Sequence, residues 1–175
     1  MIVLNCDITS LKIDIIVNAA NKTLLGGGGV DGLIHRKAGL GLREECVKLN
    51  GCNEGEAKIT NAYNLLCSKI IHTVGPIYKD GKNNECEILK MCYVNCMEIA
   101  ESYRKENNLN NITIAFPCIS TGAFGYPKDA ASSIAVNAIR EINNENIKVV
   151  FVCYEVTDYQ IYVKNVYGID INYLS

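Results

Sequence analysis

A loop with four consecutive glycines precedes an aspartate in LLGGGGVDGLIHR, residues 24–36. These residue types, at this spacing, could bind an anion and catalyse a reaction of the bound molecule. Backbone N–H groups without side chains can converge on an anion, and a helix amino terminus beside them adds a positive dipole end. Asp31 could orient or deprotonate a water molecule there. The alternatives are a flexible loop and a helix N-cap at Asp31. Because a helix amino terminus stabilises a carboxylate, we expect Asp31 to be a weak base that needs help from a substrate phosphate.

The same glycines match the pattern GxGxxG through Gly27, Gly29 and Gly32. That pattern marks a dinucleotide site when its first glycine directly follows a strand, and here residues 18–25 intervene. No Gly-Lys-Ser/Thr follows, so the P-loop pattern fails as well. A nicotinamide-dependent oxidoreductase is therefore the weakest hypothesis.

A second loop, CISTGAFGYP at residues 118–127, could form an opposing wall. Ser120, Thr121 and Gly122 offer hydroxyl and backbone N–H groups to a phosphate, and the ring of Phe124 could lie on a sugar. The alternative is an ordinary strand–helix turn with Phe124 in the core. Two such loops at neighbouring strand ends could hold a diphosphate from both sides.

Polar residues at other strand ends add hydrogen-bonding groups. Asn18 and Asn21 of NAAN suit ribose hydroxyls, and Asp7 could accept from an adenine amino group. Loop hydrogen bonds and an Asx-turn are the alternatives. His35 lies one helical turn after Asp31 and could orient it, but we favour a structural role for this histidine.

Buried, β-branched runs that alternate with amphipathic segments must position these loops. We expect strands at 2–6, 13–19, 57–63, 69–74, 112–116 and 147–154, and helices at 31–38, 41–49, 84–105, 127–142 and 158–166. This alternation predicts an α/β domain with helices on both faces of a largely parallel sheet. Ligands bind outside the carboxyl ends of such strands, which selects the loops at 7–10, 18–31 and 120–126 and the segment after Tyr154.

Composition limits the class of protein. The 175 residues are 49% hydrophobic and carry a net charge of −2, which predicts one domain over residues 1–175 and argues against general nucleic-acid binding. Without a leader or a membrane-length apolar run, we expect a soluble cytoplasmic protein, and we take a monomer as the working state. The nine cysteines include no CxxC pair, so we expect free thiols in a reducing compartment and no metal site.

Five motifs in this order resemble the macrodomain family, specifically its MacroD-type ADP-ribosyl hydrolase branch. They are DITSL (7–11), DIIVNAANKTLLGGGGVDGLIHRKAG (14–39), GEAKIT (55–60), IHTVGP (71–76) and AFPCISTGAFGYP (115–127). The resemblance implies a three-layer α/β/α domain that binds ADP-ribose without a cofactor or metal. It further implies removal of mono-ADP-ribose from acidic side chains of proteins and deacetylation of O-acetyl-ADP-ribose. The alternatives are a non-catalytic ADP-ribose reader and an ADP-ribose 1″-phosphate phosphatase.

The resemblance also implies roles for matching residues. Asp7 would accept from the adenine amino group, with the Ile8 backbone beside it. Asp31 matches the catalytic aspartate, and Asn21, supported by Asn18, would hold the distal ribose beside it; we group these two asparagines with Asp31 as the catalytic set. The remaining substrate-binding positions would be Gly28, Gly29, Val30, Ser120, Thr121, Gly122, Ala123 and Phe124.

Two positions depart from the family pattern. Cys6 stands before Asp7 where glycine is usual, and it would be strained if that position needs a positive φ. Phe124 stands where tyrosine is frequent, which removes a hydroxyl and keeps the ring. Neither departure touches Asp31.

Overall fold

A sheet of six strands forms the centre of the molecule. The computed structural model describes residues 1–170. The strands are β1 (Ile2–Asn5), β2 (Ile15–Ala19), β3 (Ala57–Asn61), β4 (Lys69–Thr73), β5 (Ile112–Phe116) and β6 (Ile147–Cys153), in the spatial order β1-β6-β5-β2-β4-β3. Among these strands every neighbouring pair is parallel except β3 with β4. The expected largely parallel sheet is therefore confirmed, and the β3–β4 pair makes it mixed.

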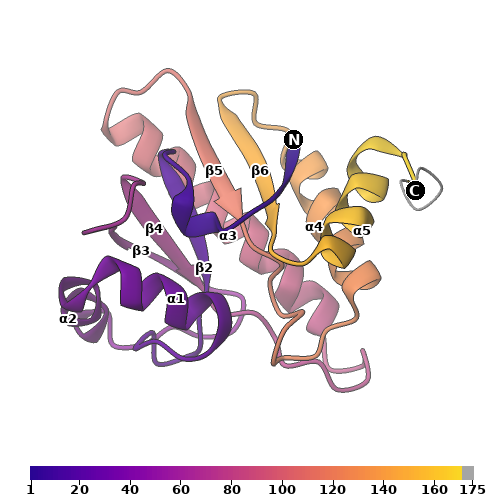
Figure 1. The fold of residues 1–175 in the computed structure, drawn as a ribbon, viewed down its shortest axis with the longest axis horizontal. Coiled ribbons are helices and arrows are strands. Elements are labelled where there is room, and N and C mark those ends of the chain that lie inside the picture. The colour runs from indigo at the N-terminus through magenta and orange to yellow at the C-terminus, as the bar shows by residue number, and fades with distance from the viewer. Residues whose placement is uncertain (171–175) are drawn as a thin grey trace.

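Helices cover both faces of the sheet and make three layers (Figure 1). The helices are α1 (Gly29–Ala38), α2 (Leu40–Lys48), α3 (Glu85–Glu106), α4 (Lys128–Ile142) and α5 (Val156–Tyr167), with a short 3-10 helix, η1, at Ile8–Ser10. Helices α1 and α2 pack on one face, and α3, α4 and α5 pack on the other. Each expected strand and helix exists with ends within two residues of its predicted limits, whereas η1 was not predicted.

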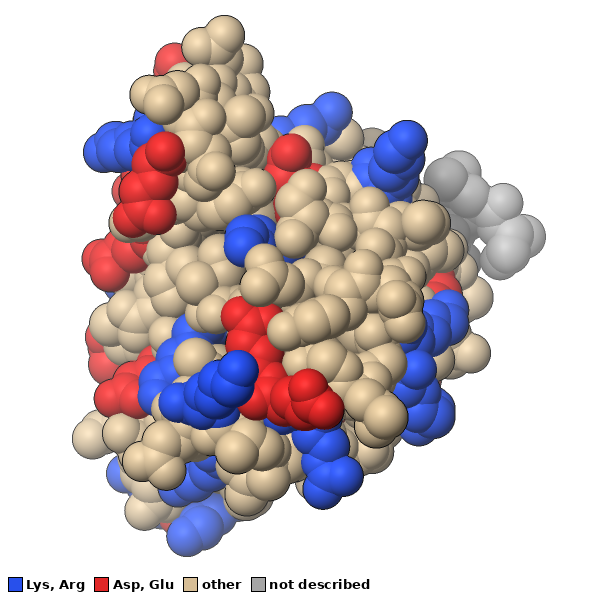
Figure 2. All heavy atoms as spheres, turned by 90° about the vertical axis from the view of Figure 1, so that its left-hand side faces the viewer, with Lys and Arg blue, Asp and Glu red and all other residues tan. Residues whose placement is uncertain are grey.

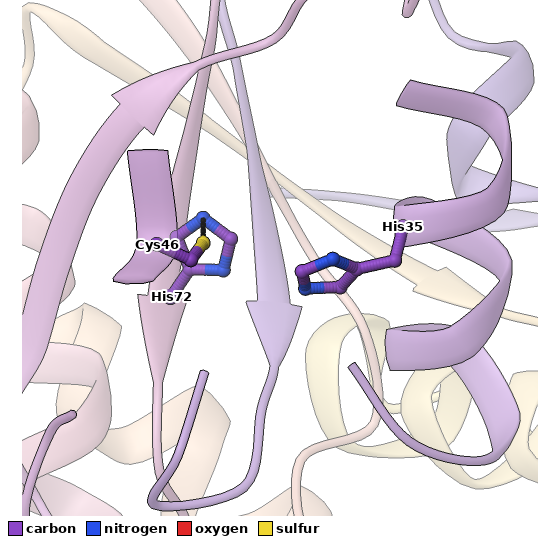
Figure 3. Close-up of side chains that lie close together, drawn as sticks. All are labelled: His35, Cys46 and His72. Atoms are coloured by element: carbon purple, nitrogen blue, oxygen red, sulfur yellow. Dashed lines mark hydrogen bonds between the residues drawn. The ribbon is translucent and has the colours of Figure 1, made fainter. Parts of the chain in front are cut away.

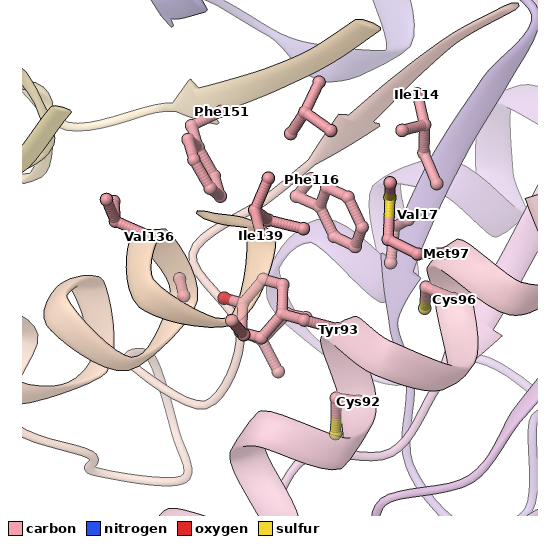
Figure 4. Packing of buried hydrophobic residues seen from close by; sticks show 14 of the residues in the cluster. Val17, Cys92, Tyr93, Cys96, Met97, Ile114, Phe116, Val136, Ile139 and Phe151 are labelled. Atoms are coloured by element: carbon pink, nitrogen blue, oxygen red, sulfur yellow. The ribbon is translucent and has the colours of Figure 1, made fainter. Parts of the chain in front are cut away.

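Alternation along the strands divides the core between the two faces. Ile15 and Val17 join the cluster under α3–α5, whereas Ile16 between them joins the cluster under α1 and α2. Tyr93 of α3 is fully buried in the first cluster, with its ring centroid 5.2 Å from that of Phe116 (Figure 4). Each such side chain contributes about 1.5–3 kcal/mol when buried. A sheet buried on both faces explains why these strands read as continuous apolar runs.

Strands β2 and β5 are neighbours whose connections leave to opposite faces. The chain after β2 leads to α1 on one face, and the chain after β5 leads to α4 on the other. Such a reversal in an open parallel sheet opens a crevice beyond the carboxyl ends of the strands. The fold thus brings the glycine loop and the loop after β5 to opposite sides of one crevice.

Figure 2 shows the face of the molecule that lies on the left in Figure 1. Basic and acidic side chains are mixed on this face. No broad patch of one sign covers that face. Within residues 1–170, no helix is both long enough and apolar enough to cross a membrane.

Candidate active site

A cleft of about 740 Å³ opens beyond the carboxyl ends of β1, β2, β5 and β6. This volume lies in the range of small-molecule sites. Every predicted substrate-binding residue lines it: Asp7, Ile8, Asn21, Gly28, Gly29, Val30, Asp31, Ser120, Thr121, Gly122, Ala123 and Phe124. Asn18 does not line the cleft, because it is fully buried behind Asp31. The fold brings these segments together, and the role of each residue stays a prediction.

The glycines at the cleft do two different things. A Cβ added to Gly28, Gly29 or Gly122 would meet nothing within 4 Å, so these residues present bare backbone to open space. A Cβ on Gly32 would instead overlap the carbonyl oxygen of Gly27. Gly32 therefore allows α1 to pack beneath the glycine loop. The expectation of a cradle with exposed backbone fits this geometry.

Asp31 is the third residue of α1, and Gly28 is the N-cap, so the alternative that Asp31 caps the helix is wrong. Its side chain is buried, and Oδ1 accepts a hydrogen bond of 2.8 Å from Nδ2 of Asn18. Burial raises the pKa of Asp31 above its ordinary value of 3.8, against the lowering effects of Asn18 and His35. The expectation that stabilisation by the helix terminus would dominate is corrected, because desolvation outweighs it. The need of Asp31 for help from a substrate phosphate stays a prediction.

His35 is close to Asp31 without a good hydrogen bond to it. Its Nε2 lies 3.5 Å from Oδ1 of Asp31. Burial lowers the pKa of His35, although the Asp31 carboxylate acts in the opposite direction, so the ring is neutral at neutral pH. This contact is therefore not a charged pair under working conditions, and a role for His35 in orienting Asp31 stays a hypothesis.

Behind Asp31, a chain of buried polar groups leads into the sheet. Asn18 Nδ2 lies 3.1 Å from Nδ1 of His72, and Nε2 of His72 lies 2.9 Å from Oγ1 of Thr60. Burial lowers the pKa of His72 to about 3. His72 is not among the candidate residues that the sequence indicates. The only signal that could reveal it is the strand register, in which Asn18 of β2 pairs with His72 of β4.

Among the described residues, His35, Cys46 and His72 bring three potential metal-ligand atoms within 4.8 Å of one another (Figure 3). Both ring nitrogens of His72 already have hydrogen-bonding neighbours. Burial raises the pKa of the Cys46 thiol to about 11, so the sulfur stays protonated at neutral pH. A structural zinc centre takes four ligands, including thiolates. The cluster therefore fits a hydrogen-bonded network better than a metal centre.

The opposing loop is held in shape by its own backbone. Ser120 adopts a left-handed conformation with φ +65°, and its carbonyl accepts from Tyr126 N at 2.9 Å. The hydroxyl of Ser120 is buried at the cleft and has no partner within residues 1–170. Phe124 is half-buried at the cleft, so the alternative that it belongs to the core is wrong. A strained, unpaired serine in a cleft is typical of a functional loop.

Two of the predicted ligand residues also shape their own loops. Asn21 donates to the carbonyl of Gly26 at 3.0 Å and accepts from Thr23 N at 3.0 Å. Asp7 accepts from Thr9 N at 2.9 Å and pairs with Lys37 at 2.8 Å. A carboxylate and an amide have further hydrogen-bonding capacity, so both can still contact a ligand.

Cys6, which stands where the family usually has glycine, has no backbone strain. Cys6 is not among the residues with positive φ, so the loss of a glycine here costs no left-handed strain. Burial raises the pKa of Asp7, but Lys37 and Thr9 outweigh it and the net pKa is lowered. Asp7 is therefore ionised and ready to accept hydrogen bonds.

Several cleft residues were not singled out from the sequence. Lys128 lies at the cleft, 2.7 Å from Glu155 and 2.9 Å from Asp158. Cys118 lies there too, with its sulfur 3.7 Å from that of Cys153. The four cleft residues follow β5 or β6 in the chain: Cys118, Lys128, Glu155 and Asp158. The rule that ligands bind at the carboxyl ends of strands is the signal that could have found them.

Comparison with known proteins covers most of the chain. The Macro domain family model matches residues 17–135, which include the glycine loop and the loop after β5. The O-acetyl-ADP-ribose deacetylase of Citrobacter koseri is 47% identical over 158 residues, or 85% of each chain. The ADP-ribose glycohydrolase MACROD2 of Homo sapiens is 47% identical over 163 residues, covering 90% of this chain and 37% of that protein.

A solved structure shares the fold. The Trypanosoma brucei macrodomain in complex with ADP-ribose superposes with a TM-score of 0.81 at 38% identity, covering 94% of this chain and 68% of that one. Identity at this level over nearly the whole chain indicates homology as well as a common fold.

Proposed function

This chain belongs to the Macro domain family, and from that premise we propose that it is a hydrolase that acts on ADP-ribose esters. It would remove mono-ADP-ribose from acidic side chains of proteins and deacetylate O-acetyl-ADP-ribose. The observation that carries the proposal is Asp31, a buried carboxylate of raised pKa at the wall of a cleft lined by bare glycine backbone. The names of two relatives, an ADP-ribose glycohydrolase and an O-acetyl-ADP-ribose deacetylase, support it.

In this proposal, the two loops bind the substrate and Asp31 activates water. The bare backbone of Gly28 and Gly29 faces the diphosphate and distal ribose, opposite the loop of residues 120–124. Asp31 accepts a proton from the attacking water, with the substrate phosphate holding the same water. Asn18 supports this carboxylate through its hydrogen bond. Asp7, outside the segment that the family model matches, binds the adenine amino group together with the Ile8 backbone.

When the carboxylate is joined to the anomeric carbon, as in a glutamate-linked substrate, hydrolysis of the ester can follow two routes with the same products. Water attacks either the anomeric carbon or the ester carbonyl, and the C–O bond at the attacked carbon breaks. Both routes give ADP-ribose with a free hydroxyl and a free carboxylate. Turnover in ¹⁸O-labelled water separates them, because the label enters ADP-ribose in the first route and the carboxylate in the second. An acetyl ester on another ribose hydroxyl is cleaved only by attack at its carbonyl.

The decisive experiment compares the wild type with Asp31→Asn. Each protein is incubated with Glu-linked mono-ADP-ribosylated protein and with O-acetyl-ADP-ribose, and the products are identified by mass spectrometry. Loss of the base should slow turnover by about 100- to 10,000-fold while ADP-ribose binding is retained. Asp129→Asn is the matched control, because Asp129 is an exposed carboxylate in the first turn of α4.

Three outcomes would contradict the proposal. Tight ADP-ribose binding by the wild type without product from either substrate would identify a reader module. Release of phosphate from ADP-ribose 1″-phosphate, with both esters untouched, would identify a phosphatase. Unchanged turnover in Asp31→Asn would remove Asp31 from the mechanism.

We also propose that residues 1–175 act as one monomeric domain in a reducing compartment, the cytoplasm. Both core clusters share the one sheet, which supports a single domain. All nine cysteines are free, which supports a reducing compartment.

A further inference from the structure

We propose that His72, buried beneath the cleft, is a positioning residue that directs the side-chain amide of Asn18 toward Asp31. The hydrogen-bond chain is a structural claim, whereas its effect on turnover rests on the proposed function. His72 reaches no substrate, because it is fully buried and does not line the cleft. Its hydrogen-bonded link to Asp31 runs through Asn18.

The geometry places the nitrogen of Asn18 between two acceptors. Asn18 Nδ2 lies 2.8 Å from Oδ1 of Asp31 and 3.1 Å from Nδ1 of His72. An amide NH₂ group has two hydrogens, one for each acceptor. The opposite orientation of the amide would put its oxygen against the Asp31 carboxylate, with no hydrogen between the two. The Asn18–His72 register of β2 and β4 holds the two side chains next to each other.

His72 must then carry its proton on the far nitrogen. Because Nδ1 accepts from Asn18, Nε2 bears the hydrogen and donates to Oγ1 of Thr60 at 2.9 Å. The thiol of Cys46 lies 3.8 Å from the same Nε2 (Figure 3). Burial holds the pKa of His72 at about 3, so the ring keeps this single proton at neutral pH. His72 is therefore a permanent acceptor toward Asn18.

Asn18 has little else to fix its orientation. Its Oδ1 is buried without a hydrogen-bond partner within residues 1–170. The two contacts of Nδ2 thus decide which way the amide faces. Without an acceptor at position 72, the amide can rotate away from Asp31. The Asn18 hydrogen bond lowers the pKa of Asp31, so its loss should raise that pKa and loosen the carboxylate.

Two variants separate the two sides of the imidazole. His72→Asn places an amide oxygen near the position of Nδ1 and keeps an acceptor for Asn18. His72→Gln places its amide near the position of Nε2, which keeps the Thr60 side and removes the acceptor. Both replace a buried ring by a smaller amide, so each controls for the cavity made by the other.

We expect His72→Gln to lose about 10- to 100-fold in kcat through misplacement of Asp31, with KM and ADP-ribose affinity nearly unchanged. The acid limb of its pH–kcat profile should move to higher pH. His72→Asn should restore most of the kcat. Equal kcat losses in the two variants, with no movement of the acid limb, would show that His72 merely fills space.

A measurement without substrate keeps the inference testable if either variant fails to fold. The chain has two histidines, so ¹⁵N spectra of histidine-labelled wild-type protein can be assigned with His72→Asn or His35→Asn. We expect His72 to carry a proton on Nε2 and none on Nδ1 between about pH 5 and 8. A proton on Nδ1 would overturn the inference. An inactive wild type with the expected tautomer would instead contradict the proposed function alone.

Discussion

Replacing Gly32 with alanine should destabilise the protein, although alanine is the better helix former. Gly32 is buried in the first turns of α1. At an open helix position this change stabilises by about 1 kcal/mol. Here the added methyl would overlap the carbonyl oxygen of Gly27 and lie 3.1 Å from Nη1 of Arg36. The sign of the effect therefore depends on whether the glycine loop can move away.

The obstacle is backbone, so the cost of overpacking should be near the upper end of its usual range, about 3 kcal/mol. Subtracting the helix gain leaves a net loss of about 2 kcal/mol in the free energy of unfolding. In a domain of this size that loss lowers Tm by roughly 4–8 °C. Because Gly27 to Val30 line the cleft, ADP-ribose affinity should also fall, by about tenfold or 1.4 kcal/mol.

Thermal unfolding and calorimetric titration with ADP-ribose measure both effects. Gly122→Ala is the control for thermal unfolding, because its methyl would point into open space and should change stability by less than about 0.5 kcal/mol. A Gly32→Ala protein with a raised Tm and full affinity would refute the reasoning. It would show that the loop is slack and that Gly32 matters only for helix propensity.

Two further predictions concern pH. The kcat of the wild type should fall as the pH drops toward the pKa of Asp31, because only the carboxylate can accept a proton from water. Burial raises this pKa above 3.8. A pH–rate profile without an acid limb above pH 3.8 would contradict the role of Asp31 as the base. Burial raises the pKa of Glu85, but hydrogen bonds from the backbone N–H groups of Glu85 itself, Asn83 and Lys79 outweigh it and lower the pKa to about 2. The stability that ionised Glu85 contributes should be complete above about pH 4.5 and should be lost as the pH falls through 2. In thermal melts, Glu85→Gln should therefore have a lower Tm than the wild type at pH 7 and nearly the same Tm near pH 2. A Tm deficit that is equal at both pH values would point to packing rather than charge.

The secondary structure was predictable where a local pattern carries the information. The runs ending in Val17 and Phe116 are apolar on both faces, and this is visible without knowledge of their neighbours. The arrangement of loops at one edge also followed, since it depends on strand direction and not on exact pairing.

The sequence indicates the effect of the helix terminus on Asp31 but not the effect of its burial. The position of Asp31 in the first turn of α1 follows from the local sequence, so the stabilisation of its carboxylate by the helix amino terminus could be predicted. Desolvation depends on the loop and strands packed around the carboxylate, and it outweighs that effect. His72 was missed for a related reason: its contact with Asn18 exists only because β2 and β4 pair in one particular register. No pattern in either segment alone specifies that register.

The supports of Asp31 and the walls of the cleft belong to different parts of the fold. Asn18 and His72 project from adjacent buried strands, whereas residues 120–124 form a loop after β5. Under the proposed function, a substitution in that loop would alter how the diphosphate and distal ribose fit without disturbing the carboxylate beneath. Because the two parts lie on different elements, the shape of the cleft can change through the loop while the buried support of Asp31 stays intact.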